Sequence, residues 1–143
     1  MKPCCDIWTV FDEKNLVIKE YASWKLLVRN RNTTLGNCVA ITKRHLESFS
    51  DISPGEMAEF ALVVKDAERV LKHAFSYDKI NYLMLMMKDK HTHFHIIPRY
   101  SGPRDFAGMT WNDEGWPAMP GGQKEALSPE ILYLIKAEIQ NHL

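Results

Sequence analysis

The sequence lacks a net charge, long apolar runs and a disulfide framework, and each absence narrows its class. Eighteen basic residues balance eighteen acidic ones, so no overall field attracts nucleic acid or an acidic membrane. No apolar run is long enough for a signal peptide or a membrane span. Three cysteines, with Cys4 and Cys5 adjacent, do not form a disulfide framework. We therefore expect a cytoplasmic protein with no nucleic-acid or membrane partner.

The chain of 143 residues is long enough to bury a sizeable core, and 45% of it is hydrophobic, as in ordinary globular proteins. Neither an internal repeat nor a low-complexity segment divides it. We expect a single domain over residues 1–143. It would comprise a core at about 7–100, an ordered loop at 101–125 and a C-terminal helix at 128–141.

Short apolar segments separated by polar turns predict β-strands in most of the core. They lie at residues 7–11, 16–19, 24–29, 38–42 and 79–87. The tight connections between the first four favour an antiparallel meander. The last segment is apolar on both faces, which predicts a central strand whose methionines belong to the core rather than to a metal site.

Two segments change to a helical period. Ser53, Pro54 and Glu56 form a helix-start signal, and we expect the main helix to run from residue 54 to 75. Its predicted apolar stripe consists of Met57, Phe60, Ala61, Val64, Ala67, Leu71 and Ala74. A second helix should open at Ser128 and end near Asn141, with a stripe of Leu132, Ile135 and Ile139. His73 falls outside the first stripe, so we expect it at the surface.

Three of the six histidines lie within five residues, at 91, 93 and 95. Polar and apolar residues alternate over 91–99, which predicts a strand with the three imidazoles on one face. Thr92, Phe94 and Ile96 would then face the core. Because the turn at 88–90 is short, this strand should lie beside 79–87 in the middle of the sheet.

A metal site is one interpretation of this histidine row. Side chains on one face of a strand are about 6.6 Å apart, so His91 and His95 would be separated by roughly 13 Å. Zinc binds its nitrogen ligands at about 2.0–2.1 Å, so two of the rings could share an ion but three could not. Cys4 and Cys5 lack the Cys-x-x-Cys spacing of zinc ligands.

Polyphosphate binding fits the spacing better than a metal site or a plain sheet surface. A neutral imidazole can attack phosphorus while a charged neighbour stabilises its oxygens. Six basic residues lie nearby in the sequence, and we expect no more than two of them to contact the phosphates. They are Lys43, Arg44, Lys88, Lys90, Arg99 and Arg104.

The segment from His91 to Ile97 resembles the His-φ-His-φ-His-φ-φ signature of the histidine triad (HIT) superfamily, with Thr92 as a departure. Pro98 and Arg99 are similar to the diadenosine-polyphosphate hydrolase branches, and 36–45 followed by a Ser-Pro helix resembles the family's middle section. The resemblance covers about 7–100. It implies an α+β fold with a five-stranded antiparallel sheet, one long helix and a C-terminal helix, usually paired into a homodimer.

The resemblance also implies a nucleotide hydrolase or transferase that acts at the α-phosphate of a phosphoanhydride or phosphoramidate. His93 would carry a covalent nucleotidyl intermediate, His95 would bind the phosphate oxygens, and His91 would orient His93 or meet the leaving group. The implied substrate is an adenine nucleotide such as a diadenosine polyphosphate, with AMP as product. No metal and no cofactor is expected.

Departures from the family pattern define further candidate contacts. Asn37 stands where many members have a fourth histidine, and Arg29, with Asn30 beside it, stands where an Asn or Asp commonly holds the ribose. Lys88 begins the short turn that replaces a Gly-Gln-Ser/Thr segment. With Arg99, these residues are the candidate nucleotide-binding set.

Two other functions stay open at this stage. One is a nucleotide-binding regulatory module with little turnover, and the other is a metal-dependent hydrolase. Trp111 or Trp116 could stack on a base, although packing in the core or a dimer interface is the better expectation. We expect a structural role for His45.

Overall fold

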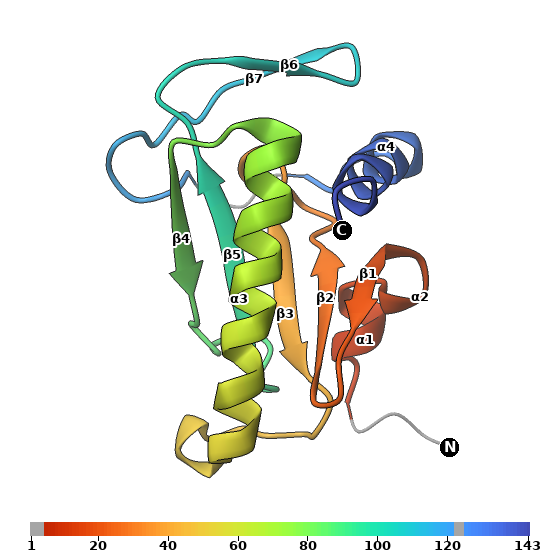
Figure 1. Cartoon of the computed structure of the whole chain (residues 1–143), viewed down its shortest axis with the longest axis vertical. Coiled ribbons are helices and arrows are strands. Elements are labelled where there is room, and N and C mark those ends of the chain that lie inside the picture. The colour runs from red at the N-terminus through yellow and green to blue at the C-terminus, as the bar shows by residue number, and fades with distance from the viewer. Residues whose placement is uncertain (1–4, 122–124) are drawn as a thin grey trace.

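The computed structural model describes residues 5–121 and 125–143. Its centre is a five-stranded antiparallel sheet of strand order β1-β2-β3-β5-β4 (Figure 1). The strands are β1 (Val17–Glu20), β2 (Trp24–Val28), β3 (Cys38–Thr42), β4 (Lys79–Leu83) and β5 (His93–Arg99). With a long helix and a C-terminal helix, this confirms the expected α+β fold.

The long helix α3 (Pro54–Phe75) has the predicted bounds and lies across one face of the sheet (Figure 1). Its start is a capping box, because the Ser53 hydroxyl accepts from the Glu56 amide and the Glu56 carboxylate accepts from the Ser53 amide. The apolar side chains that it buries are Phe60, Val63, Ala67, Val70, Leu71 and Phe75. Met57 and Ala61, expected in this stripe, are exposed instead.

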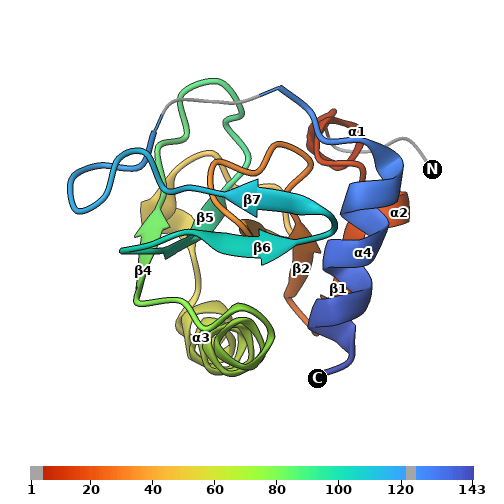
Figure 2. The same cartoon turned by 90° about the horizontal axis from the view of Figure 1, so that it is seen from above.

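The C-terminal helix α4 (Pro129–Gln140) lies near α3 and the β1–β2 edge of the sheet (Figure 2). The Ser128 hydroxyl accepts a hydrogen bond from the Ile131 amide and caps its start. Its buried residues are the three predicted, Leu132, Ile135 and Ile139. One apolar core therefore joins α3, α4 and the sheet face that they cover.

The prediction of a strand at residues 7–11 is wrong. This segment forms a short helix, α1 (Ile7–Val10), which is followed by α2 (Glu13–Leu16). Ile7 and Phe11, four residues apart, are both buried, whereas Thr9 between them is exposed. The segment packs on the sheet face opposite α3, against Leu27, Val39 and Ile41. The helical turn places Ile7 and Phe11 on one side and leaves Thr9 exposed, whereas a strand would place all three side chains on the same face.

The prediction of a central strand at residues 79–87 is also wrong. β4 stops at Leu83 and lies at the edge of the sheet. The chain then leaves the sheet through Met86, whose φ is 52°, and leaves Leu85 and Met87 64% and 83% exposed. The histidine strand β5 lies between β3 and β4, as predicted, although it begins at His93 rather than His91.

The segment after β5 contains a small hairpin that the sequence did not reveal. It is formed by β6 (Arg104–Phe106) and β7 (Met109–Trp111) and crosses above the sheet in Figure 2. Ala107 and Gly108 supply two positive φ angles at its turn. Trp111 is partly buried against the core, as expected, and its Nε1 donates to the Phe106 carbonyl at 3.1 Å.

A one-turn 3-10 helix, η1 (Phe49–Asp51), precedes α3. Within the described ranges, no helix combines the length and the apolarity that a membrane crossing requires.

Candidate active site

The alternation along β5 gives its two faces different environments. Phe94 packs against Phe60 of α3, with ring centroids 4.6 Å apart, and Ile96 is completely buried in the main core. His93 and His95 lie on the opposite face. The ring of Phe11 covers both, with centroids 5.5 Å from His93 and 6.0 Å from His95. The fold thus holds two imidazoles beneath an aromatic ring on the face not covered by α3.

A cavity of about 520 Å³ opens at this face, a size typical of sites for small organic ligands. Both His93 and His95 contribute to its wall. The candidate nucleotide contacts Arg29, Asn30 and Lys88 also line it. Apolar lining comes from Phe11 and from the segment after β4, so the methionines there shape this cavity rather than a central strand.

His93 is held in a defined tautomer. Its Nδ1 lies 2.7 Å from the main-chain oxygen of His91. Since a carbonyl oxygen only accepts, Nδ1 carries the hydrogen, and the lone pair of the neutral ring resides on Nε2. The ring is 4% exposed and stands nearly perpendicular to that of His95, at 5.1 Å between centroids.

His95 is kept neutral by its surroundings. Burial lowers the pKa of its imidazole to about 3, and the charges of Arg29 and His93 add to that effect. Its Nδ1 is buried and has no hydrogen-bond partner within the described structure. At neutral pH this ring therefore offers neutral donor and acceptor groups rather than a cation.

His91 lies apart from the other two rings. Its Nε2 donates to the Thr42 carbonyl at 2.6 Å, and its Nδ1 is 3.3 Å from the Cys5 sulfur. It lines a second, smaller pocket that also includes His45. Burial is the main reason that the pKa of His91 is lowered. His91 therefore reaches the active face through its main-chain oxygen, which holds His93.

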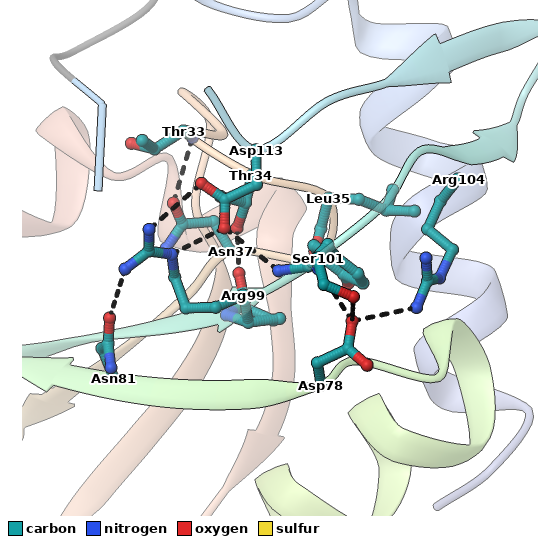
Figure 3. A network of polar contacts seen from close by, with 12 residues as sticks. Thr33, Thr34, Leu35, Asn37, Asp78, Asn81, Arg99, Ser101, Arg104 and Asp113 are labelled. Carbon is teal, nitrogen blue, oxygen red and sulfur yellow. Dashed lines mark hydrogen bonds and ion pairs between the residues drawn. The ribbon is translucent and has the colours of Figure 1, made fainter. Parts of the chain in front are cut away.

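Two candidate residues, Asn37 and Arg99, form their hydrogen bonds within the fold rather than at the cavity. Asn37 is completely buried; its amide donates to the Ile96 carbonyl at 3.1 Å and its oxygen accepts from the Thr33 amide at 3.0 Å. Arg99 donates through Nε to Asp113 at 2.7 Å and through Nη1 to Asn81 at 2.8 Å (Figure 3). Neither residue is part of the cavity wall.

Most of the other basic candidates are also paired. Lys43 lies 2.7 Å from Glu20, Arg44 lies 2.6 Å from Glu56, and Arg104 lies 3.3 Å from Asp78. The last of these pairs is visible in Figure 3. Of the six basic residues named from the sequence, Lys88 is the one that lines the larger cavity.

A possible metal-binding group lies at the smaller pocket. Cys5, His45 and His91 place a sulfur and two ring nitrogens within 4.8 Å of one another. The donor types suit zinc, and the buried Nδ1 of His45 has no hydrogen-bond partner in the described part of the chain. The opposite nitrogens are fixed, His45 Nε2 by Glu47 at 2.7 Å and His91 by Thr42, as is usual for zinc ligands.

These three residues would hold the ion, which would join the N-terminal segment to the loop before η1. Sequence reasoning missed the group because it assigned His45 a structural role and considered only Cys4 and Cys5 as helpers. Cys4 lies outside the described residues. His45 is visible in the sequence as the last of three basic residues that follow β3, at 43–45. Only the fold brings it next to Cys5 and His91.

The chain was compared with known protein families. Residues 12–102 match the HIT domain. The chain belongs to the HIT family. The matched range includes the motif from His91 to Ile97.

A curated relative of this HIT protein is an uncharacterized HIT-like protein of Methanocaldococcus jannaschii, 33% identical over 72 residues. The match covers 47% of this chain and 55% of that protein, so it spans about half of the relative's length.

Two solved structures show the same fold. A histidine triad protein from Sinorhizobium meliloti has a TM-score of 0.72 at 20% identity, with 92% of each chain covered. The diadenosine triphosphate hydrolase of Plasmodium falciparum, solved with cyclomarin A, has a TM-score of 0.67 at 15% identity. That comparison covers 90% of this chain and 76% of the hydrolase.

Proposed function

We propose that this HIT protein cleaves a nucleoside phosphoanhydride or phosphoramidate at the α-phosphate through a nucleotidyl intermediate on His93. The observation that carries the proposal is the bond from His93 Nδ1 to the His91 carbonyl, at 2.7 Å. It leaves the Nε2 lone pair of a neutral ring available in a cavity that His95 also lines. An imidazole that is held in place and directs this nitrogen at a ligand-sized cavity suits nucleophilic catalysis.

The reaction would proceed in two displacements. In the first, the Nε2 lone pair of His93 forms a bond to phosphorus, and the bond from phosphorus to the leaving group breaks with its electron pair. In the second, a water oxygen attacks phosphorus and gives up a proton to the surrounding solvent, and the bond from phosphorus to Nε2 breaks, so that Nε2 regains its lone pair. The product is a nucleoside monophosphate, or a transferred nucleotide if another acceptor replaces water.

The neighbouring residues would hold the reacting group in place. His95, neutral at physiological pH, would donate to a phosphate oxygen. His91 would act as a positioning residue through its carbonyl. Phe11 would exclude water from the two rings that it covers. Adenine nucleotides are the proposed substrates, and diadenosine polyphosphates should be tested first because a neighbour of the same fold hydrolyses diadenosine triphosphate.

The test is to incubate the protein with diadenosine polyphosphates, adenylyl sulfate and adenosine phosphoramidate, and to measure AMP release and the adduct. We expect AMP from at least one substrate and a nucleotidyl group on His93 in acid-free mass spectrometry. His93→Ala should reduce the rate by at least about a thousandfold. His73→Ala, which removes an exposed histidine of α3, is the matched control. Equal rates in His93→Ala and the control would refute the assignment of the nucleophile.

One observation favours the second candidate, a nucleotide-binding module with little turnover. The buried amide of Asn37 bonds to the backbone through both its oxygen and its nitrogen and is not part of the cavity wall, so it does not replace the fourth histidine of many HIT proteins there. This function predicts micromolar AMP binding that persists in His93→Ala, with no detectable adduct in the parent protein. Adduct formation in the first experiment therefore separates the two candidates.

A homodimer and a cytoplasmic location belong to the same proposal. Support for the dimer comes from the exposed side chains of Leu85 and Met87 beside the edge strand β4. Sedimentation equilibrium of the parent protein and of Leu85→Ser with Met87→Ser tests it. We expect the parent to be dimeric and the double variant to be a weaker dimer, which dissociates at a higher protein concentration than the parent.

A further inference from the structure

Arg29 lies immediately after β2 at the larger cavity. Its amide donates to the Asn37 carbonyl at 2.9 Å, which continues the pairing of β2 with β3. Leu27, two residues earlier, belongs to the cluster that packs on the active face with Val39, and Val39 pairs with His95. The alternation therefore puts Arg29 on the face of His95, and it forms part of the cavity wall.

The guanidinium of Arg29 is held by its own loop. Nη1 donates to the Arg31 carbonyl at 3.0 Å and to the Thr33 hydroxyl at 3.3 Å. Asn32 fixes the loop, because its side chain donates to the Arg29 carbonyl and accepts from the amides of Gly36 and Asn37. The cation is thus oriented before any ligand binds.

One edge of this guanidinium makes no hydrogen bond within the described residues. Nε is buried without a partner, and no bond is formed by Nη2. These two nitrogens together form the edge that binds phosphate or carboxylate oxygens in pairs. An arginine has no acceptor, so this edge cannot accept a hydrogen bond from a ribose hydroxyl.

The cavity also carries an excess of positive charge. Arg29, Arg31 and Lys88 line it, whereas Asp89 is the one carboxylate in its wall among the described residues. None of the three cations forms an ion pair with another described residue. Burial and the nearby charge of Arg31 both lower the pKa of Arg29. A partly buried cation beside a like charge is stabilised when an anion binds between them.

We propose that Arg29, with Arg31, forms a second anion site in the cavity, so that the substrate is a nucleotide with a further phosphate besides the one at His93. The inference rests on the proposed function for the identity of the ligand as a nucleotide. The further phosphate is either a monoester on the ribose or the next phosphate of the chain. The two sources share the same chemistry and are separated by the choice of probes.

Calorimetric titration of the His93→Ala protein, in which turnover is removed, provides the test. The probes are AMP, adenosine 3′,5′-bisphosphate and ADP. We expect the second phosphate of at least one probe to tighten binding by about 10- to 100-fold relative to AMP, as for hydrogen bonds between charged groups. Arg29→Gln should abolish that gain. Lys65→Gln, which removes an exposed cation of α3 outside both pockets, should retain it.

The outcomes separate this proposal from the proposed function. A gain for the bisphosphate alone assigns the site to the ribose phosphate, and a gain for ADP alone assigns it to the chain. If the parent protein forms the His93 adduct but no second phosphate tightens binding, or the gain survives Arg29→Gln, the anion site is refuted. If the gain depends on Arg29 but no adduct forms with any substrate, the anion site stands and the catalytic proposal fails.

Arg29→Lys, which keeps the charge, should retain part of the gain in affinity. It provides the test if Arg29→Gln does not fold.

Discussion

The ring of His93 is hydrogen-bonded to the backbone of His91, with 2.7 Å between Nδ1 and the carbonyl oxygen. The first histidine of the motif thus acts on the second through its main chain, while its own ring faces Cys5 and Thr42. A substitution that changes only the His91 ring leaves this bond in place.

The covalent adduct should therefore form on Nε2 of His93. Nδ1 is occupied by its hydrogen bond, and attack from it would require the ring to turn away from the strand. Two-dimensional NMR that correlates phosphorus with the ring protons of the trapped, labelled protein measures the linkage. Coupling through Nδ1 would contradict the orientation described above.

The depressed pKa of His95, about 3, predicts a loss of stability in acid. Between this value and the unfolded value near 6.5, the unfolded chain binds the proton and the folded chain does not. The free energy of unfolding therefore falls as the pH drops from about 6.5 towards 3. In His95→Gln the fall should be less steep, by up to about 1.4 kcal/mol per pH unit. Denaturant titrations between pH 7 and 4 measure it, and parallel curves for the two proteins would oppose the prediction.

Removal of the Asp113 carboxylate should destabilise the fold. Asp113 accepts from Arg99 Nε at 2.7 Å (Figure 3) and from the Tyr100 amide at 3.0 Å. Its side chain is fully buried. Asp113→Ala leaves a buried guanidinium without its partner, which costs about 3–5 kcal/mol of unfolding free energy. Asp105→Ala, in the exposed hairpin, is the control and should change it by about 0.5 kcal/mol or less. Comparable losses in the two variants would mean that the buried pair is not the cause.

Gly36→Ala should also destabilise the protein, for two reasons. The φ of Gly36 is +83°, and an added Cβ would come within 2.7 Å of the Phe75 ring. Overpacking of this kind costs about 1–3 kcal/mol, to which the left-handed backbone adds about 1 kcal/mol. Phe75→Leu in the same chain should recover part of the loss by making room. The control is Gly102→Ala, where nothing lies within 4 Å of an added Cβ; a similar melting temperature for both alanine variants would disprove the steric argument.

Zinc should stabilise the protein through Cys5, His45 and His91. At a hundredfold excess over its dissociation constant, a ligand adds about 2.7 kcal/mol, which raises the Tm of a chain of this size by roughly 5–10 °C. Scanning calorimetry after EDTA treatment, with and without zinc, measures the shift. Calcium, which prefers oxygen ligands, is the control ion. An equal shift in Cys5→Ala would show that the ion binds elsewhere.

The parts of the fold with a strong local signal could be predicted from the sequence. The helix-start signal at Ser53 predicted the start of α3, and the apolar spacing that follows predicted its extent. The stripe of Leu132, Ile135 and Ile139 predicted the buried face of α4. Period-two alternation also gave the orientation of Phe94 and Ile96. In each case the signal lies within one element and depends on no distant partner.

The errors arose where a distant partner decides the structure. Apolar residues at 7–11 suit a strand equally well until the sheet face that they cover is known. Leu83, Leu85, Met86 and Met87 line a cavity and do not extend a central strand. Asn37 and Arg99 were assigned to the nucleotide because of their place in a motif, yet their hydrogen bonds go to the backbone and to Asp113. A one-dimensional pattern shows which side chains are polar but not which partners satisfy them.

The parity of β5 has a consequence for how this chain can change in length. One residue inserted or deleted within β5, between His93 and His95, would reverse the alternation beyond that point, so that only one of the two imidazoles could face the cavity. No single point substitution would undo that reversal. The turn of the later hairpin, at Ala107 and Gly108, joins two strands without this constraint, so a change of length is better tolerated there.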